Sequence, residues 1–156
     1  MEKKLIAGIS LGDFNGIGVE IILKTFKDNR VLDNITPIIY GKAELLEHYI
    51  DLIPELSVSF ETIKSANKVK HQKINLITIS EEAFSCNPGK ESLEAGKFAY
   101  LSLKLVTDDL SKGLIDLLIT APINKKNIQS EAFNFPGHTE FLTSMSNIDQ
   151  SLMFMV

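Results

Sequence analysis

The segment FPGHTEFL, residues 135–142, combines the residue types of a ligand-binding turn. Pro136 and Gly137 favour a turn, and the spacing after them predicts the start of a helix. His138 and Thr139 occupy that start, where free backbone N–H groups can bind an anion and the two side chains add hydrogen-bonding groups. We therefore expect His138 and Thr139 to contact substrate; a loop histidine without a ligand is the alternative.

The segment TAPINK, residues 120–125, follows an apolar run that is typical of a buried strand. In open α/β sheets, ligands bind at the carboxyl ends of strands. Thr120 and Asn124 could hydrogen-bond a ligand there, and Lys125 could face an anionic group. A plain strand end with a solvated Lys125 is the competing interpretation.

The segment GDFNGIGVE, residues 12–20, lies between a predicted strand and a predicted helix. Glycines permit a close backbone approach, and a helix N-terminus offers N–H groups to an anion. The segment matches neither the dinucleotide fingerprint nor the phosphate loop that ends in Gly-Lys-Ser/Thr. A turn without a ligand therefore remains open; if the loop faces a ligand, Gly12, Asn15 and Gly16 are the candidate cofactor-binding residues.

Other reactive side chains form no catalytic or metal-binding pattern. The three histidines lie far apart, and His48 and His71 fit solvated positions, so we expect no metal ligands within this sequence. No Ser-His-Asp or Cys-His arrangement can be argued. The single Cys86 excludes an internal disulfide and fits a reducing compartment.

The composition predicts one ordinary globular domain. The chain has 156 residues, 44% of them hydrophobic and 23% charged, with a net charge of −4. Its basic residues are scattered, and the short cluster at 67–73 fits a solvated connection, so we expect no nucleic-acid partner. No apolar run reaches membrane-spanning length, and the N-terminus lacks a signal peptide's apolar run. We expect a cytoplasmic protein without a membrane partner.

The pattern along the chain favours an α/β layered fold with a mainly parallel sheet. Mostly continuous apolar segments predict strands covered on both faces, and an alternating segment predicts a strand with one wet face. The continuous segments are 4–10, 35–41, 74–80, 114–122 and 151–156, and the alternating one is 56–60. Helical spacing predicts helices at 17–26, 42–53 and 92–111, the last ending before Gly113.

Two further expectations concern the connections and the end of the chain. The turn residues at 85–92 predict a mobile surface excursion. The segment 151–156 reads as a buried strand with no closing helix after it. Because a domain seldom stops within its core pattern, we expect the chain to be part of a longer protein.

Taken in order, GDFNGIGVE, LITAPINK and FPGHTEFL resemble the 4-hydroxythreonine-4-phosphate dehydrogenase family of pyridoxine phosphate (vitamin B6) biosynthesis. The first motif is the loosest, because Phe14, Asn15 and Val19 stand where the family has Pro, Ala and Pro. This loop also resembles a turn of isocitrate and isopropylmalate dehydrogenases, whose fold the family shares. The resemblance spans nearly the whole chain and implies isocitrate/isopropylmalate dehydrogenase-like α/β/α layers. It makes residues 1–156 the N-terminal portion of a two-lobed enzyme, with the second half beyond Val156.

The resemblance also implies an activity. The family oxidises 4-phosphohydroxy-L-threonine with NAD or NADP, and decarboxylation gives 3-amino-2-oxopropyl phosphate. It works as a homodimer with a divalent metal (zinc, magnesium or cobalt) that polarises the hydroxyl and then the ketone. By its match to the family's motif, the segment FPGHTEFL implies that His138 and Thr139 are the substrate-binding pair. The resemblance also implies that the metal-ligand histidines fall beyond Val156, so this chain alone would be inactive.

Two other functions remain open. Relatives within the same class act on phosphorylated threonate or erythronate, or on an aromatic dihydrodiol, and the residues present do not separate these substrates. A chain that is complete at 156 residues could instead be a non-catalytic ligand-binding or interaction module.

Overall fold

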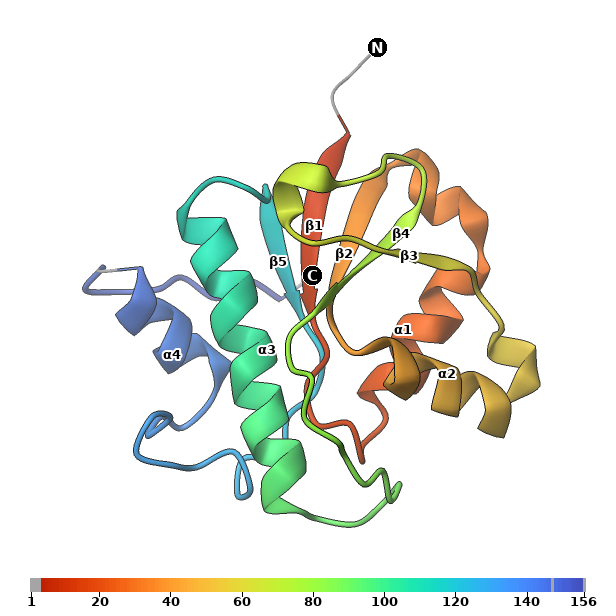
Figure 1. Ribbon diagram of the computed structural model, residues 1–156. Helices are drawn as coiled ribbons and strands as arrows, with labels where there is room; N and C mark the ends of the chain where they lie inside the picture. The colour runs from red at the N-terminus through yellow and green to blue at the C-terminus, as the bar shows by residue number, and fades with distance from the viewer. Residues whose placement is uncertain (1–3, 147, 156) are drawn as a thin grey trace.

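A five-stranded sheet forms the centre of the molecule, and each of its strand pairs is parallel (Figure 1). The computed structural model describes residues 4–146 and 148–155. The strands are β1 (Leu5–Ser10), β2 (Ile35–Gly41), β3 (Phe60–Thr62), β4 (Ile74–Thr78) and β5 (Leu117–Thr120). The helices are α1 (Gly18–Lys27), α2 (Ala43–Leu52), α3 (Leu93–Ser111) and α4 (His138–Met145), with short 3-10 turns at Asn29–Asp33, Pro54–Leu56 and Ala66–Lys68.

The order of the strands places β1 and β5 at a change in winding direction. The order is β3-β4-β2-β1-β5, so the chain moves from β1 to β2 on one side and later returns to β5 on the other side. Ser10, at the end of β1, is in register with both Tyr40 of β2 and Thr120 of β5. The carboxyl ends of β1 and β5 therefore meet at a topological switch point, the place where open α/β sheets bind ligands.

Helices cover both faces of the sheet because its strands are apolar on both faces. Alternate residues of β2 point to opposite faces: Ile39 joins the core with α1 and α2, whereas Ile38 and Tyr40 join a second core with Val106 of α3. A third cluster packs α4 and the segment before it against α3 through Leu103, among others. The result is the α/β/α layering that the sequence predicts.

A buried serine on α3 joins that helix to the ends of two strands. Ser102 is fully buried; its Oγ accepts a hydrogen bond from the Leu11 N–H at 2.9 Å and donates one to the Tyr40 carbonyl at 2.6 Å. Leu11 is the first residue after β1. α3 therefore fixes the point at which the chain leaves β1 and enters the Gly12–Gly16 loop.

Most predicted elements are confirmed. The predicted strands at 4–10, 35–41, 74–80 and 114–122 correspond to β1, β2, β4 and β5, the last of them shorter than expected. The three predicted helices differ from α1 and α2 by one residue at each end and from α3 by one residue at its start, and the predicted helix at His138 is α4.

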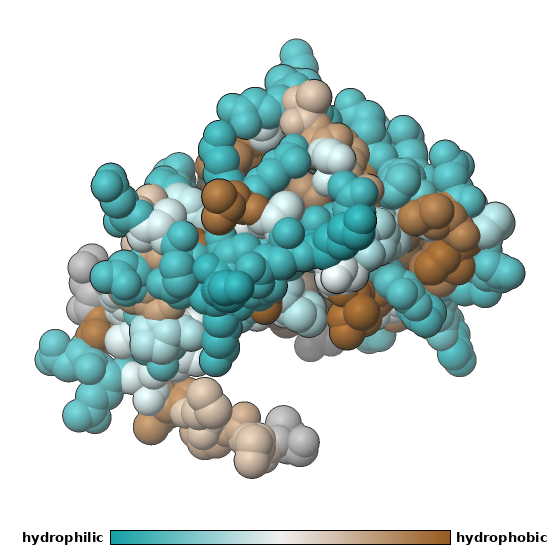
Figure 2. Space-filling view, turned by 90° about the horizontal axis from the view of Figure 1, so that it is seen from below, coloured by the Kyte–Doolittle hydropathy of each residue, from teal (hydrophilic) through white to brown (hydrophobic). Residues whose placement is uncertain are grey.

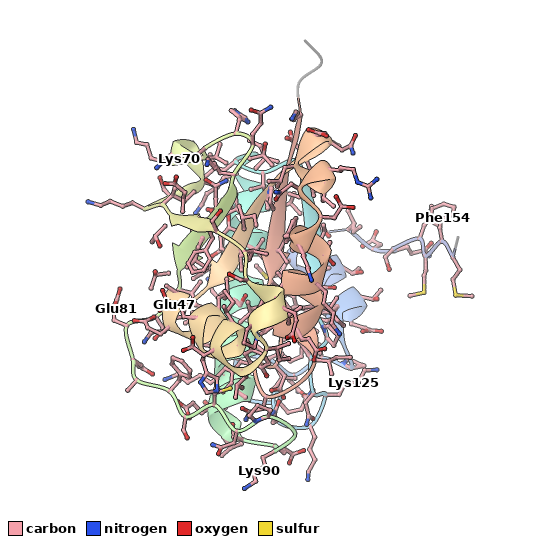
Figure 3. The ribbon with its side chains drawn as sticks, turned by 90° about the vertical axis from the view of Figure 1, so that its right-hand side faces the viewer. Glu47, Lys70, Glu81, Lys90, Lys125 and Phe154 are labelled. Carbon is pink, nitrogen blue, oxygen red and sulfur yellow. The ribbon has the colours of Figure 1, made fainter. Side chains whose placement is uncertain are left out.

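Two predicted strands are wrong. At 56–60, Pro54 starts a 3-10 turn that ends at the buried Leu56, and the strand begins only at Phe60. Residues 151–155 form no strand, and Leu152 to Met155 are 73–94% exposed. This segment stands away from the body, as the labelled Phe154 shows (Figure 3), so it lacks the paired neighbour that a strand needs. Val156 lies outside the described residues.

Within the described part of the chain, no helix has the length and apolar character needed to cross a membrane.

Candidate functional site

The carboxyl ends of β1 and β5 border a pocket of about 310 Å³. Its volume is at the lower end of the range for small-molecule sites. The pocket is lined by three segments that are distant in sequence: Asp13, Asn15, Gly16 and Ile17; Gly89, Lys90 and Glu91; and Pro122, Ile123 and Asn124. Viewed from this end, the molecule presents a largely hydrophilic face (Figure 2). The GDFNGIGVE and TAPINK motifs therefore share one site at the switch point.

The loop after β1 approaches the turn after β5 so closely that it requires glycine. Gly12 has a φ of +71°, and a Cβ atom on it would lie 2.3 Å from the carbonyl oxygen of Pro122. The next N–H, that of Asp13, donates to the same carbonyl at 3.0 Å. Gly12 thus allows the two loops to pack against each other.

A buried carboxylate locks the two loops together. Asp13 is 6% exposed, and its Oδ2 accepts a hydrogen bond from Asn127 Nδ2 at 2.8 Å. Its Oδ1 accepts one from the Asn15 N–H at 2.8 Å. With each oxygen bonded inside the protein, Asp13 supports the loop.

Glu91 links two of the segments that line the pocket. Its carboxylate accepts a hydrogen bond from Asn124 Nδ2 at 3.1 Å and pairs with Lys126 Nζ at 3.1 Å. Hydrogen bonds from Lys126 and then Asn124 hold the pKa of Glu91 below its ordinary value. By contrast, Lys90 and Lys125 make no ion pair within the described part of the chain. Both lie at the end of the molecule where the strands finish, so two ammonium groups there can attract an anion (Figure 3).

The His138 ring lies at the N-terminus of α4, next to the TAPINK turn. Lys125 Nζ is 3.9 Å from the position that a Cβ atom on Gly137, the N-cap of α4, would take. Burial, and then the charge of Lys125, lower the pKa of His138 below its ordinary value, which favours the neutral ring. Its Nε2 is buried and has no hydrogen-bond partner among the described residues. Such an orphaned polar atom is costly unless a water or a ligand supplies a partner.

A family model described as "Pyridoxal phosphate biosynthetic protein PdxA" matches residues 33–156, most of the chain. The chain belongs to the PdxA family. This membership confirms the resemblance carried by the three motifs.

Named relatives of the chain are dehydrogenases. It is 36% identical over 156 residues to a 4-hydroxythreonine-4-phosphate dehydrogenase of Bacteroides thetaiotaomicron, covering 99% of this chain and 43% of that protein. It is 29% identical over 158 residues to a putative D-threonate 4-phosphate dehydrogenase of Oceanobacillus iheyensis, covering 99% of this chain and 47% of the relative. The crystal structure of a 4-hydroxythreonine-4-phosphate dehydrogenase from Burkholderia phymatum superposes with a TM-score of 0.86 at 26% identity, over 96% of this chain and 46% of that one. The chain thus spans about half the length of the relatives that it matches.

The structure brings the predicted site residues together in part. Asn15 and Gly16 line the pocket, whereas Gly12 is not part of the lining but packs against the carbonyl of Pro122, which is. His138 and Thr139 are not part of its lining; they begin α4, whose N-cap Gly137 lies close to Lys125. Their assignment to substrate, like that of the loop to cofactor, stays a prediction.

Sequence reasoning missed the pocket wall at Lys90 and Glu91 and the support from Asn127. The Asn-Pro-Gly turn at 87–89 predicts a loop, but nothing in its local sequence indicates which loop it contacts. Asn127 follows the TAPINK turn as an ordinary polar residue, and only its burial, at 5% exposed, reveals its role.

No group of three or more His, Cys, Asp or Glu side chains that could hold a metal ion occurs within residues 4–146 and 148–155. The described residues alone therefore supply no complete set of ligands for the metal that the resemblance implies.

Proposed function

We propose that this chain forms one side of the active site of an NAD(P)- and metal-dependent dehydrogenase that oxidises 4-phosphohydroxy-L-threonine with decarboxylation. The main support is that the GDFNGIGVE and TAPINK turns meet in one pocket at the switch point of a parallel sheet. The third motif, FPGHTEFL, lies next to the TAPINK turn. The higher identity to the 4-hydroxythreonine-4-phosphate dehydrogenase than to the D-threonate enzyme favours this substrate. We further propose that the intact enzyme is a homodimer.

The charges at the site suit a phosphorylated acid. Lys90 and Lys125 supply unpaired positive charge, and the first N–H groups of α4 add hydrogen-bond donors. His138, whose neutral form is favoured, can donate through Nε2 to a substrate hydroxyl or acid oxygen. Thr139, the next residue of α4, adds a hydroxyl at the same helix end.

The nicotinamide cofactor supplies the hydride acceptor, and this chain's loops contribute to binding it. Gly16 leaves the pocket floor open for a close approach at the N-terminal end of α1. Asp13 and Gly12 hold that loop against the turn after β5, which keeps the pocket in shape before any ligand binds.

The test is a kinetic comparison on the intact enzyme. His138→Ala should raise the KM for 4-phosphohydroxy-L-threonine and lower kcat, together costing about a hundredfold in kcat/KM, because a hydrogen bond to a charged or reacting group is lost. His48→Ala, which changes a histidine on α2, is the matched control and should leave both constants near wild type. Bound metal, measured by atomic emission, should stay at the wild-type level; loss of metal in His138→Ala would show that the ring is a metal ligand.

D-threonate 4-phosphate is the second candidate substrate, because relatives that carry that activity in their names share 29% identity with this chain. Both substrates are phosphorylated hydroxy acids, so the lysines and α4 would serve either one. Formation of reduced cofactor with each substrate separates them: a higher kcat/KM for D-threonate 4-phosphate would reassign the enzyme.

A further inference from the structure

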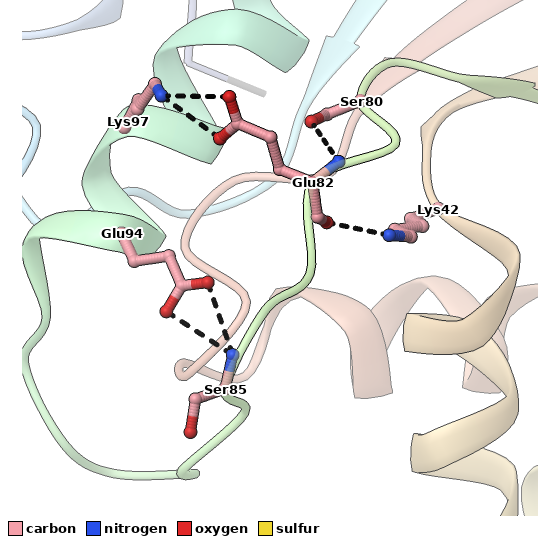
Figure 4. Close-up of polar contacts among 6 residues, drawn as sticks. All are labelled: Lys42, Ser80, Glu82, Ser85, Glu94 and Lys97. Carbon is pink, nitrogen blue, oxygen red and sulfur yellow. Dashed lines mark hydrogen bonds and ion pairs between the residues drawn. The ribbon is translucent and has the colours of Figure 1, made fainter.

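The connection from β4 to α3 forms one wall of the pocket, and its first part is anchored on two helices. The Lys42 ammonium, at the N-terminus of α2, donates to the Glu82 carbonyl at 2.8 Å. The Ser85 N–H donates to the Glu94 carboxylate of α3 at 3.2 Å (Figure 4). These contacts fix residues 80–85 but stop short of the pocket-lining residues Gly89 to Glu91.

Asn15 holds the remaining part, residues 87–92. Its side-chain Oδ1 accepts a hydrogen bond from the Asn87 N–H at 2.8 Å. Its Nδ2 donates to the Lys90 carbonyl at 2.9 Å and to Ser92 Oγ at 3.2 Å. Its backbone carbonyl accepts from the Gly89 N–H at 2.7 Å. Asn15 is 4% exposed, and we call this set of four bonds the Asn15 staple.

The neighbouring residue adds apolar contacts to the same segment. The Phe14 ring packs edge-on against Phe84 at 5.8 Å and against Phe98 of α3 at 5.4 Å. The Cys86 thiol donates to the Phe14 carbonyl at 3.8 Å. Phe14 and Asn15 are two of the positions at which the loop departs from the family pattern, so this anchoring is built from residues that the pattern does not contain. The segment 85–92 lies largely on the surface, as predicted, and these bonds tie it to the loop after β1; its mobility stays a prediction.

We propose that Asn15 is a positioning residue, whose side chain fixes the 87–91 wall of the pocket and does not itself bind the cofactor. Both N–H donors of its amide and one lone pair of its oxygen are bonded to protein groups, and the residue is buried, so the side chain has little capacity to bind a ligand. A wall held in place before binding removes part of the ordering cost of binding. The expected effect of Asn15 on cofactor binding rests on the proposed function. The hydrogen bonds of the Asn15 staple do not depend on it.

Amide hydrogen exchange tests the staple without any ligand. In Asn15→Ala, the Asn87 N–H loses its acceptor and should exchange about tenfold faster, whereas the Gly89 N–H keeps its bond to the backbone carbonyl of residue 15. Trypsin should cleave after Lys90 correspondingly faster. General destabilisation would instead accelerate both amides together, and equal or unchanged exchange at Asn87 and Gly89 overturns the proposal.

A second variant keeps the test decisive if Asn15→Ala folds poorly. Asn15→Asp retains the acceptor for the Asn87 N–H but loses the donor to the Lys90 carbonyl. It should protect the Asn87 amide as in wild type while cleavage after Lys90 still accelerates; accelerated Asn87 exchange here overturns the assignment of that bond. Lys97→Ala, which removes an exposed ion pair to Glu82, is the matched control and should match wild type in both assays.

Kinetics on the intact enzyme separate positioning from direct catalysis. Asn15→Ala should raise the KM for NAD by about tenfold, because binding must then pay the cost of ordering residues 87–91. It should change kcat by less than about twofold, because the wall is ordered once the cofactor is bound. A loss of kcat at unchanged KM would overturn the positioning role. If the wild-type enzyme uses neither NAD nor NADP, the proposed function fails. Amide hydrogen exchange at Asn87 and Gly89 then tests the Asn15 staple on its own.

Discussion

Gly96, inside α3, is required by a backbone contact, and replacing it with alanine tests how the site is built. A Cβ atom on Gly96 would lie 2.0 Å from the carbonyl oxygen of Asn127 and 2.4 Å from its carbonyl carbon. It would also lie 2.9 Å from the Oδ1 of the same residue, whose amide nitrogen holds Asp13. α3 and the turn after β5 can therefore approach each other only because residue 96 has no side chain.

Two opposing effects decide the sign of the Gly96→Ala change. Alanine is favoured over glycine in a helix interior by about 1 kcal/mol. Overpacking typically costs about 1–3 kcal/mol, and here the cost lies at the upper end, because backbone atoms cannot rotate away. The free energy of unfolding should fall by about 2 kcal/mol, which lowers Tm by about 4–8 °C for a chain of this size.

Thermal unfolding followed by circular dichroism measures this change. Lys97→Ala alters the next residue of the same helix at an exposed position and should leave the free energy of unfolding within about 0.5 kcal/mol of wild type. Were helix propensity the deciding effect, Gly96→Ala would raise Tm by about 2–4 °C. A Tm at or above that of wild type would therefore refute the close approach of α3 and Asn127.

Further predictions concern α3 and the His138 environment. Ser102→Ala leaves the Leu11 N–H and the Tyr40 carbonyl without their buried partner and should lower the free energy of unfolding by about 2 kcal/mol in urea titrations, whereas the exposed Ser111→Ala should not. Because the pKa of His138 lies below 6.5 in the folded protein, its contribution to stability is complete above pH 6.5 and is lost as the pH falls through the folded-state pKa. His138→Gln should remove that part of the pH dependence, and an unchanged pH profile would contradict the shift. Lys125→Met should raise the pKa of His138 in an NMR titration, because a nearby positive charge is removed, but the pKa should stay below 6.5, because burial is the larger cause. The control Lys126→Met breaks the ion pair with Glu91 and should leave the pKa of His138 unchanged.

The elements that sequence predicts well are those whose local signals agree with their surroundings. β2 is apolar throughout and lies between β1 and β4, with helices on both faces, so its pattern and its environment match. α3 begins after Ser92, whose side chain accepts a hydrogen bond from the Ala95 N–H as an N-cap should, and ends just before Gly113. In both cases a few neighbouring residues determine the outcome.

The candidate site depends on contacts between distant residues, and sequence predicts these only in part. Parallel topology brings strand ends to one edge, so the meeting of the β1 and β5 turns could be expected from the motifs. The wall formed by Gly89 to Glu91 could not be predicted, because the Asn15 staple joins Asn15 to residues 72 or more positions away. Gly96 carries a weak signal, an isolated glycine within a helical pattern, but that signal does not name Asn127 as the contact.

The segments 35–41 and 151–155 show why an apolar run alone does not define a strand. Both are short and apolar, and both predict buried strands. Residues 35–41 pair with a strand on each side and are buried almost throughout. Residues 151–155 follow α4 away from the sheet and have no paired neighbour within the described chain. Backbone hydrogen bonds to a second strand are what turn β-propensity into β-structure, so the same composition gives a core strand at one position and an extended, exposed segment at the other.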